Sequence, residues 1–147
     1  MLIGIDKRMT SELLNTLAQM GHGDEIVIAD ANFPAQSTAR HCNVQNALPL
    51  AGLDAVAAAD LITSLMPLDG FSDYAALRME IDGEADQMGD VHDDVWSVLR
   101  PRLPAGGVLD SVPRQTFYSM ARGAYAVVLT AETRPFGCFI LRKGIVS

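Results

Sequence analysis

The sequence predicts an α/β fold in which one domain, residues 1–147, carries helices on both faces of a mixed sheet. Strand-like and helical segments alternate along the chain, which is the pattern of α/β proteins. The last two strand-like segments, 125–130 and 138–142, have no helix between them, so we expect part of the sheet to be antiparallel. No repeat or Pro/Gly-rich linker divides the 147 residues, a length that suits one domain with its own core.

The first two elements follow from capping residues and apolar spacing. Thr10 or Ser11 can cap a helix that Gly21 ends, because a hydroxyl satisfies free N–H groups and glycine favours the turn after a helix. Its apolar stripe consists of Leu13, Leu14, Leu17 and Met20. The short run Glu25–Ala29 has Val and Ile at its centre and predicts a buried strand.

The stretch that follows lacks regular spacing. Residues 31–51 show neither a helical nor a strand period, and we expect irregular structure there. The residues that interrupt the pattern are Pro34, Asn43, Asn46 and Pro49. A second helix is predicted from about Leu53 to Leu65, with Pro67 just beyond its end.

A strand and a helix are predicted next. Ala76–Ile81 has the composition of a strand, and the turn signal Asp82-Gly83 ends it. A third helix is expected over about Asp90–Leu99. Pro101 and Pro104 stop it, because proline cannot continue a helix.

The C-terminal part of the sequence predicts three more strands and a helix. Gly107–Val112 suits a short strand, and Pro113 suits the first turn of a helix, which Gly123 then closes. The run Tyr125–Thr130 is a strong strand pattern. A last strand is expected over Cys138–Arg142.

Composition and charge exclude several kinds of partner. The chain is 49% hydrophobic and 20% charged, as folded proteins are, and its net charge of −7 repels phosphate backbones and anionic lipids. We therefore expect neither nucleic acid nor a membrane as a partner. The start of the chain lacks the pattern of a signal peptide, and no apolar run could span a bilayer. Cys42 and Cys138 have no Cys-x-x-Cys spacing, so a cytoplasmic protein with reduced thiols is expected.

The first candidate site residues flank the predicted strand at 25–29. Glycines on both sides of His22 allow a sharp turn that exposes the imidazole, a group that exchanges protons near neutral pH. Asp30 follows the strand directly, where ligands of open α/β sheets bind, and its carboxylate could bond sugar-type hydroxyls or orient the histidine. We expect both side chains to project from one layer of loops and to transfer protons to a polar substrate. In the simpler interpretations, the histidine only holds its loop and the aspartate only bonds its own turn.

A second pair of candidates shares one face of the predicted helix after Pro113. Arg114 and Tyr118 are four residues apart, which places them side by side on a helix. A guanidinium offers several fixed donors to an oxygen-rich ligand, and a phenol both donates and accepts. The alternative is that Tyr118 packs in the core and that Arg114 is solvated.

Metal and cofactor chemistry is not favoured by the remaining polar residues. His92, Asp93 and Asp94 could be read as ligands, but polar and acidic residues commonly open a helix. His41-Cys42 lacks partners at metal spacing. The chain has neither a phosphate-cradling glycine loop nor a Gly-x-Ser-x-Gly motif. We therefore predict no metal site and no cofactor.

Three longer segments carry a resemblance to a known family. They are Leu-Ala-Gln-Met-Gly-His-Gly-Asp-Glu at 17–25, Ala-Asp-Ala-Asn-Phe-Pro-Ala at 29–35 and Arg-Gln-Thr-Phe-Tyr at 114–118. With these segments the chain resembles the L-fucose mutarotase / D-ribose pyranase family over nearly its whole length. The Gly-His-Gly-Asp and Asp-x-Asn-Phe-Pro forms, with Arg four residues before Tyr, are similar to the fucose branch.

The resemblance implies a role for each candidate. His22 takes the position of the family's proton donor, and Asp30 and Arg114 take those of sugar-binding residues. Tyr118 matches a tyrosine at the family's site, so His22, Asp30 and Tyr118 form the expected catalytic set. The family's fold is a three-layer α/β/α domain, and its members form ring-like homo-oligomers, often decamers, with sites near subunit interfaces.

The chain departs from the family at a second contact segment, which is Tyr-Gly-Asn in relatives. The matching residues, expected to bind substrate, are Phe136, Gly137 and Cys138. The backbone groups remain, but a phenol and an amide are missing, and a site that pairs with hydroxyls is weakened by such losses.

The expected function is sugar mutarotation without a cofactor. A mutarotase interconverts the α and β anomers of a reducing monosaccharide, here L-fucose or a related aldose, by acid–base ring opening. Phe136 and Cys138 leave a non-catalytic monosaccharide-binding protein of the same fold as the alternative. A metal-dependent isomerase or hydrolase using His22, Asp24 and Asp30 is less favoured, because a metal needs three or more convergent ligands.

Overall fold

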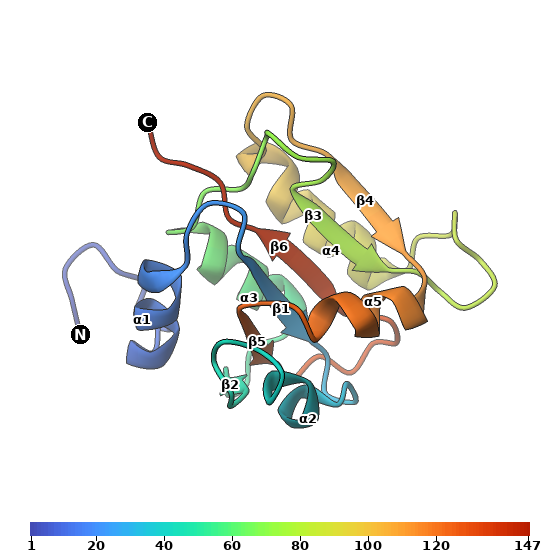
Figure 1. Ribbon diagram of the computed structural model, residues 1–147, viewed down its shortest axis with the longest axis horizontal. Helices are drawn as coiled ribbons and strands as arrows, with labels where there is room; N and C mark the ends of the chain where they lie inside the picture. Colours follow the sequence, from blue (N-terminus) through green and yellow to red (C-terminus); the bar gives the residue numbers. More distant parts are fainter.

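A six-stranded sheet forms the centre of the computed structural model, which describes residues 1–147. The strands lie in the order β2-β5-β1-β6-β3-β4 (Figure 1). Their bounds are β1 Glu25–Ala29, β2 Leu48–Pro49, β3 Ala76–Met79, β4 Leu109–Val112, β5 Ala126–Leu129 and β6 Phe139–Arg142. The helices are α1 Ser11–Gln19, α2 Ala35–Ala39, α3 Ala55–Thr63, α4 Asp90–Leu99, η1 Arg100–Arg102 and α5 Arg114–Ala121.

The sheet is mixed, as the sequence predicted. Five strands run parallel to one another, and β6 runs antiparallel to both of its neighbours, β1 and β3. Val27 of β1 therefore faces Ile140 of β6 on one side and Val127 of β5 on the other. The five parallel strands end at one edge of the sheet, and this edge collects the residues that follow β1, β3 and β4.

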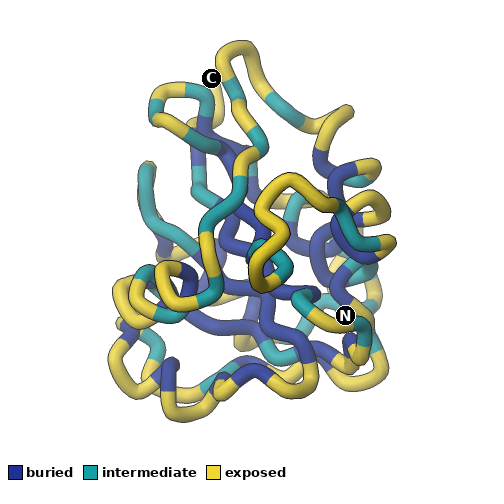
Figure 2. Tube along the Cα trace, turned by 90° about the vertical axis from the view of Figure 1, so that its right-hand side faces the viewer, coloured by how far each residue is buried: buried dark blue, intermediate teal, exposed yellow.

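Helices cover both faces of the sheet, which confirms the three-layer α/β/α arrangement. Alternate residues of β1 enter different cores, since side chains along a strand point to opposite faces. Ile26 and Ile28 pack with α1, α3 and α4, whereas Val27 and Ala29 pack with α2 and α5. Figure 2 shows the buried chain as an inner layer with exposed loops around it.

Local signals set most boundaries. The Thr10 hydroxyl accepts a hydrogen bond from the Leu13 N–H at 3.1 Å and thereby caps the start of α1. Helix α4 and strand β1 have the predicted bounds. The expectation of irregular structure over 31–51 is wrong at two places, α2 and β2. The five residues of α2 have no side-chain cap, and the two residues of β2 pair only with β5, so tertiary packing stabilises both elements.

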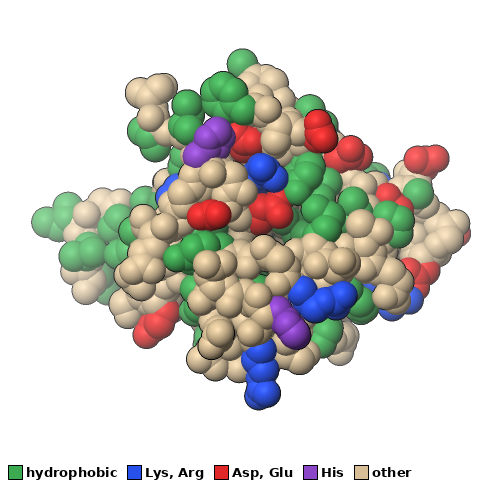
Figure 3. All heavy atoms as spheres, in the orientation of Figure 1, with side chains coloured by type: hydrophobic (Ala, Val, Ile, Leu, Met, Phe, Trp, Pro, Cys, Tyr) green, Lys and Arg blue, Asp and Glu red, His purple; other side chains and the backbone are tan.

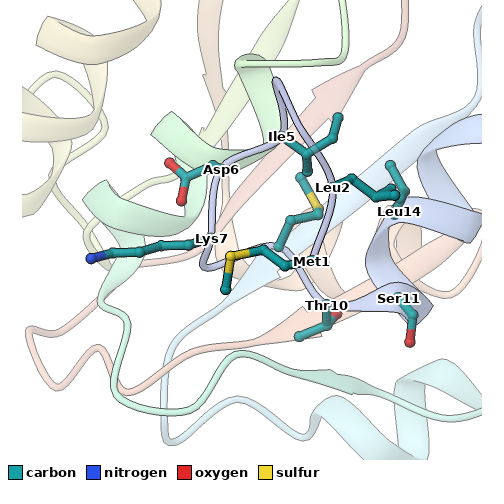
Figure 4. Close-up of a pocket in the computed structure, with 9 residues that line it drawn as sticks. Met1, Leu2, Ile5, Asp6, Lys7, Thr10, Ser11 and Leu14 are labelled. Atoms are coloured by element: carbon teal, nitrogen blue, oxygen red, sulfur yellow. The ribbon is translucent and has the colours of Figure 1, made fainter.

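The N-terminal arm leaves a cavity beside α1. It has a volume of about 280 Å³. Figure 4 shows the residues that line it, which are Met1, Leu2, Ile5, Asp6, Lys7, Met9, Thr10, Ser11 and Leu14. None of the predicted site residues lies here.

Charged side chains of both signs are spread over the face of the molecule seen in Figure 3. None of the helices has the length and apolar character that crossing a membrane requires.

Candidate active site

A small cavity lies at the edge where the five parallel strands end. Its volume is about 210 Å³. The lining residues are Asp30, Asn32, Phe33, Met79, Arg114, Tyr118, Pro135, Phe136 and Cys138. Five of the seven residues that the sequence singled out thus surround one space, at the position where open α/β sheets bind ligands.

Asp30 combines a structural role with a free oxygen. Its Oδ1 accepts hydrogen bonds from the N–H groups of Asn32 at 3.0 Å and Phe33 at 2.9 Å, so the interpretation as a turn aspartate is correct. No nitrogen or hydroxyl in the chain donates to Oδ2. Because Asp30 lines the cavity while only 7% exposed, this second oxygen is a directed acceptor for a ligand hydroxyl.

Arg114 and Tyr118 form the second polar part of the cavity, on the first turns of α5. The Nε of Arg114 donates to both carboxylate oxygens of Asp82, each at 3.1 Å, and this pairing raises the pKa of Arg114. Its guanidinium carbon lies 5.7 Å from the centre of the Tyr118 ring, which itself packs edge-on against Phe33. The pair is therefore neither buried in the core nor simply solvated.

The segment before β6 closes the cavity with apolar groups. Phe136 lines it and has a φ of 59°, in the left-handed region. Gly137 lies behind the wall, where an added Cβ would be 2.9 Å from Cγ of Glu132 and 3.0 Å from the Arg134 carbonyl. Cys138 accepts a hydrogen bond from the Asp30 N–H on its sulfur, and burial raises the pKa of its thiol well above the usual range.

His22 lies at the opposite edge of the sheet. It precedes β1 whereas Asp30 follows it, and a strand of five residues is about 16 Å long. The expectation that both side chains project from one layer of loops is therefore wrong. The sequence spacing of eight positions concealed this, because an extended strand converts sequence proximity into distance.

The imidazole of His22 has a buried acidic partner. Nε2 lies 2.9 Å from Oδ1 of Asp69, and the ring packs edge-on against Phe71 with 47% of the side chain exposed. Burial acts to raise the pKa of Asp69. Hydrogen bonds from the Ser72 hydroxyl and His22, and a further one from the Phe71 N–H, outweigh it and hold the pKa at about 2. Asp69 is therefore an ionised acceptor beside an accessible imidazole.

The turn that carries His22 is tied to the end of β6. Gly23 has a φ of 89°, and its N–H donates to the Lys143 carbonyl at 2.9 Å. The ammonium group of Lys143 donates to carbonyls at the end of α1, to Leu17 at 2.8 Å and also to Met20. The Asp24 carboxylate accepts the Gly21 N–H at 2.7 Å. These bonds fix the position of the imidazole.

Two carboxylates that the sequence patterns did not indicate hold His22 and Arg114 in place. Asp69 bonds His22, and Asp82 bonds Arg114. Both aspartates precede a glycine, at Asp69-Gly70 and Asp82-Gly83, and Asp-Gly is a common turn signal. Such a signal indicates a turn but does not indicate which group the carboxylate contacts.

The other polar candidates lie apart from the cavity. His92 lies in the first turn of α4, as expected for a polar residue that opens a helix, and it is fully buried there. His41 is exposed, and Cys42 is packed against α5 through a contact of its sulfur with the Ala121 carbonyl. No group of three or more His, Cys, Asp or Glu side chains lies together in a way that could hold a metal ion.

Comparisons with known proteins identify the family to which the chain is similar. Residues 3–146 match the model of the RbsD / FucU transport protein family. Fucose mutarotase from Homo sapiens is 37% identical, covering 99% of this chain and 95% of the relative. L-fucose mutarotase from Haemophilus influenzae is 38% identical, covering 99% and 97%. The crystal structure of the fucose mutarotase from Streptococcus pneumoniae in complex with L-fucose superposes with a TM-score of 0.87 at 32% identity, covering 99% and 100%.

Proposed function

The chain belongs to the RbsD / FucU transport protein family, and we propose on this premise that it is a sugar mutarotase. It interconverts the α and β anomers of L-fucose or a related aldose, as an isomerase without a cofactor. One observation carries the proposal: a cavity with a carboxylate, a guanidinium and a phenol lies in a chain that matches fucose mutarotases over nearly its full length.

The chemistry needs one acid and one base. The ring oxygen of the sugar gains a proton while the anomeric hydroxyl loses one, and the ring opens to an aldehyde. The carbonyl carbon then presents its other face and the ring closes. Positioned acid–base groups accelerate such a step by roughly 10²–10⁴-fold.

Each candidate residue has a part in this reaction. Asp30 accepts hydrogen bonds from sugar hydroxyls through Oδ2. Arg114 donates hydrogen bonds to sugar oxygens while Asp82 holds the Nε of Arg114. Tyr118 donates to, or accepts from, an oxygen near the anomeric centre. His22 is the principal acid and base, and Asp69 supports it because an ionised carboxylate at 2.9 Å stabilises the imidazolium and orients the ring.

A second copy of the chain brings His22 to the cavity. Within one chain the imidazole and Asp30 lie at opposite edges of the sheet, so one sugar ring cannot touch both. Large apolar side chains are exposed around both the chain ends and the His22 edge. They include Met1, Leu2, Ile3, Phe71, Ile145 and Val146. A ring-shaped homo-oligomer, with ten subunits as the family resemblance implies, would bury such groups and join the two halves of each site.

Substrate and location follow from the same features. The cavity is below the size range of drug-sized ligand pockets, which suits one monosaccharide. Phe136 and Cys138 make one wall apolar, which suits a deoxy sugar or another aldose with few hydroxyls on that side. The cytoplasm is the expected location, because the free thiols of Cys42 and Cys138 are buried and unpaired.

Exchange NMR between sugar anomers tests the proposal directly. Wild-type protein should accelerate exchange of L-fucose, and His22→Ala should reduce the acceleration by roughly 10²–10⁴-fold. The control is His41→Ala, which removes an exposed histidine outside the site and should leave the rate unchanged. A normal rate in His22→Ala would refute the assignment. Tight sugar binding by calorimetry, with exchange no faster than in buffer, would favour a non-catalytic binding protein instead.

A further inference from the structure

We infer that His92 is a positioning residue for the sugar cavity, because its imidazole holds the carbonyl of Phe136 and thereby keeps the apolar wall in place. The inference rests on the proposed function of that cavity. Neither His92 nor α4 lines the cavity, so the residue would act only through Phe136.

Hydrogen bonds on both sides fix the tautomer of His92. The Gly89 N–H donates to Nδ1 at 3.0 Å, so this nitrogen carries no proton. Nε2 lies 2.9 Å from the Phe136 carbonyl oxygen, which only accepts, so Nε2 carries the proton and donates it. One neutral imidazole thus links the start of α4 to the wall of the cavity.

Phe136 needs a stabilising hydrogen bond because its backbone conformation is unfavourable. With a φ of 59° it is the single non-glycine residue in the left-handed region. Aromatic residues avoid this region, and they remain in it only where the surroundings enforce it, commonly at ligand sites. Gly137 follows in a space too tight for a Cβ, which restricts the chain on the other side. The His92 bond therefore supports the conformation that places Phe136 at the cavity.

The surroundings keep the imidazole neutral. His92 is fully buried, and the ring of Phe139 from β6 packs edge-on at 5.9 Å. Burial lowers the pKa of His92 and outweighs the hydrogen bond to the Phe136 carbonyl, which acts to raise it. The guanidinium of Arg78 from β3 adds to the lowering, against the weaker opposing charge of Asp93. A protonated ring would have no acceptor for the Gly89 N–H.

A second tether from the same helix provides a matched control. Asp94 of α4 accepts a hydrogen bond from Nη1 of Arg134 at 2.7 Å, only two residues before Phe136. Arg134 does not line the sugar cavity. Asp94→Asn therefore weakens the connection between α4 and this loop without removing the bond to the Phe136 carbonyl.

Two amide substitutions separate the role at the cavity from the role in the helix. In His92→Gln, the side-chain oxygen can accept the Gly89 N–H and the nitrogen can donate to Phe136, so both bonds survive. In His92→Asn, the shorter amide reaches only the Gly89 N–H. The first variant should stay within about twofold of wild type in KM and kcat. The second should raise KM for L-fucose roughly tenfold with little change in kcat, because it leaves a buried carbonyl unpaired.

The measurements are exchange NMR at several L-fucose concentrations and, without sugar, the one-bond Cα–Hα coupling of Phe136, which reports the sign of φ. Equal KM values in the two amide variants, or a tenfold rise in Asp94→Asn, would overturn the inference. The ¹⁵N shifts of the His92 ring in the wild-type protein give a test that needs no variant: a proton on Nδ1 would also overturn it. A wild-type protein inactive on every aldose would refute the proposed function, whereas the coupling and the ¹⁵N shifts would still decide the role of His92.

Discussion

Asp69 couples a buried negative charge to an exposed imidazole. Its side chain is 1% exposed, and three donors converge on it from His22, Ser72 and the Phe71 backbone. Removing the charge should therefore affect both stability and proton transfer. Because Asp69 lies on the edge of the sheet away from the cavity, the two effects belong to His22 and not to the residues around Asp30.

We expect Asp69→Asn to reduce stability at neutral pH by up to about 2 kcal/mol, since the pKa of this carboxyl lies at about 2 instead of the ordinary 3.8. The folded-state pKa is depressed, so the contribution is present above pH 3.8 and is lost as the pH falls towards 2. Urea unfolding across this range should show a flatter pH dependence in the variant, together with slower anomer exchange at neutral pH.

The neighbouring variant Asp73→Asn is the control for this measurement. Asp73 is exposed and makes no side-chain hydrogen bond, so its loss should change stability by less than about 0.5 kcal/mol. Equal effects of the two substitutions would show that the hydrogen bonds at Asp69 contribute nothing beyond surface charge.

The connection between β5 and β6 is closely packed at Gly137, where it approaches the site. Residues 131–137 connect to α4 through Arg134 and then lead into β6, and a Cβ at position 137 would force its neighbours to shift. Gly137→Ala should destabilise the protein by about 1–3 kcal/mol, because its Cβ would press on Glu132, Val91 and the Arg134 carbonyl.

Thermal unfolding of Gly137→Ala beside Gly123→Ala checks this expectation. A Cβ at Gly123 would meet nothing closer than 3.5 Å, which is ordinary contact, so that variant should unfold near the wild-type temperature. Similar losses in both variants would mean that general glycine effects, not the crowding at 137, decide the result.

The elements also show how far sequence reasoning reaches. Helix α1 has a capping threonine and an apolar stripe, helix α4 ends at the prolines that follow it, and strand β1 has an apolar centre, so their bounds were predicted within a residue or two. Helix α2 and strand β2 have no such signals, because Ala35 and Ala39 become helical by packing in the second core and Leu48 by pairing with Val128. Local patterns cannot report contacts made by distant segments.

The candidate site divides in the same way. Residue types in short motifs indicated Asp30, Arg114 and Tyr118, and the family resemblance added Phe136 and Cys138. The structure brings these five residues to one cavity. The placement of His22 depends on the direction of a strand, which the motif does not encode. The carboxylates of Asp69 and Asp82 lie in turns far along the chain from the groups they bond, so only the fold reveals them.

At the scale of the whole molecule, a site shared between copies makes a distinct prediction. His22→Ala and Asp30→Asn should each be inactive alone, whereas unfolding them together and refolding the mixture should restore activity. If His22 and Asp30 of one site come from different subunits, random mixing leaves about one quarter of the sites intact. Exchange NMR on the mixture, with native mass spectrometry for the subunit number, measures the outcome.

The same mixture can also contradict the proposal of a site shared between subunits. A site built within one chain would stay inactive at every mixing ratio, because each subunit would carry one defect. Refolding each variant alone under identical conditions supplies the control.

The position of β6 has a consequence for how the polypeptide reaches its native state. This strand is the latest in chain order, yet it lies between β1 and β3 and is the sole bridge between two groups of strands. During synthesis from the N-terminus, neither group can join the other until residues 139–142 have left the ribosome. Final assembly of the core is thus a late, long-range closure, and the high contact order of this topology predicts slow folding relative to a helical bundle of equal length.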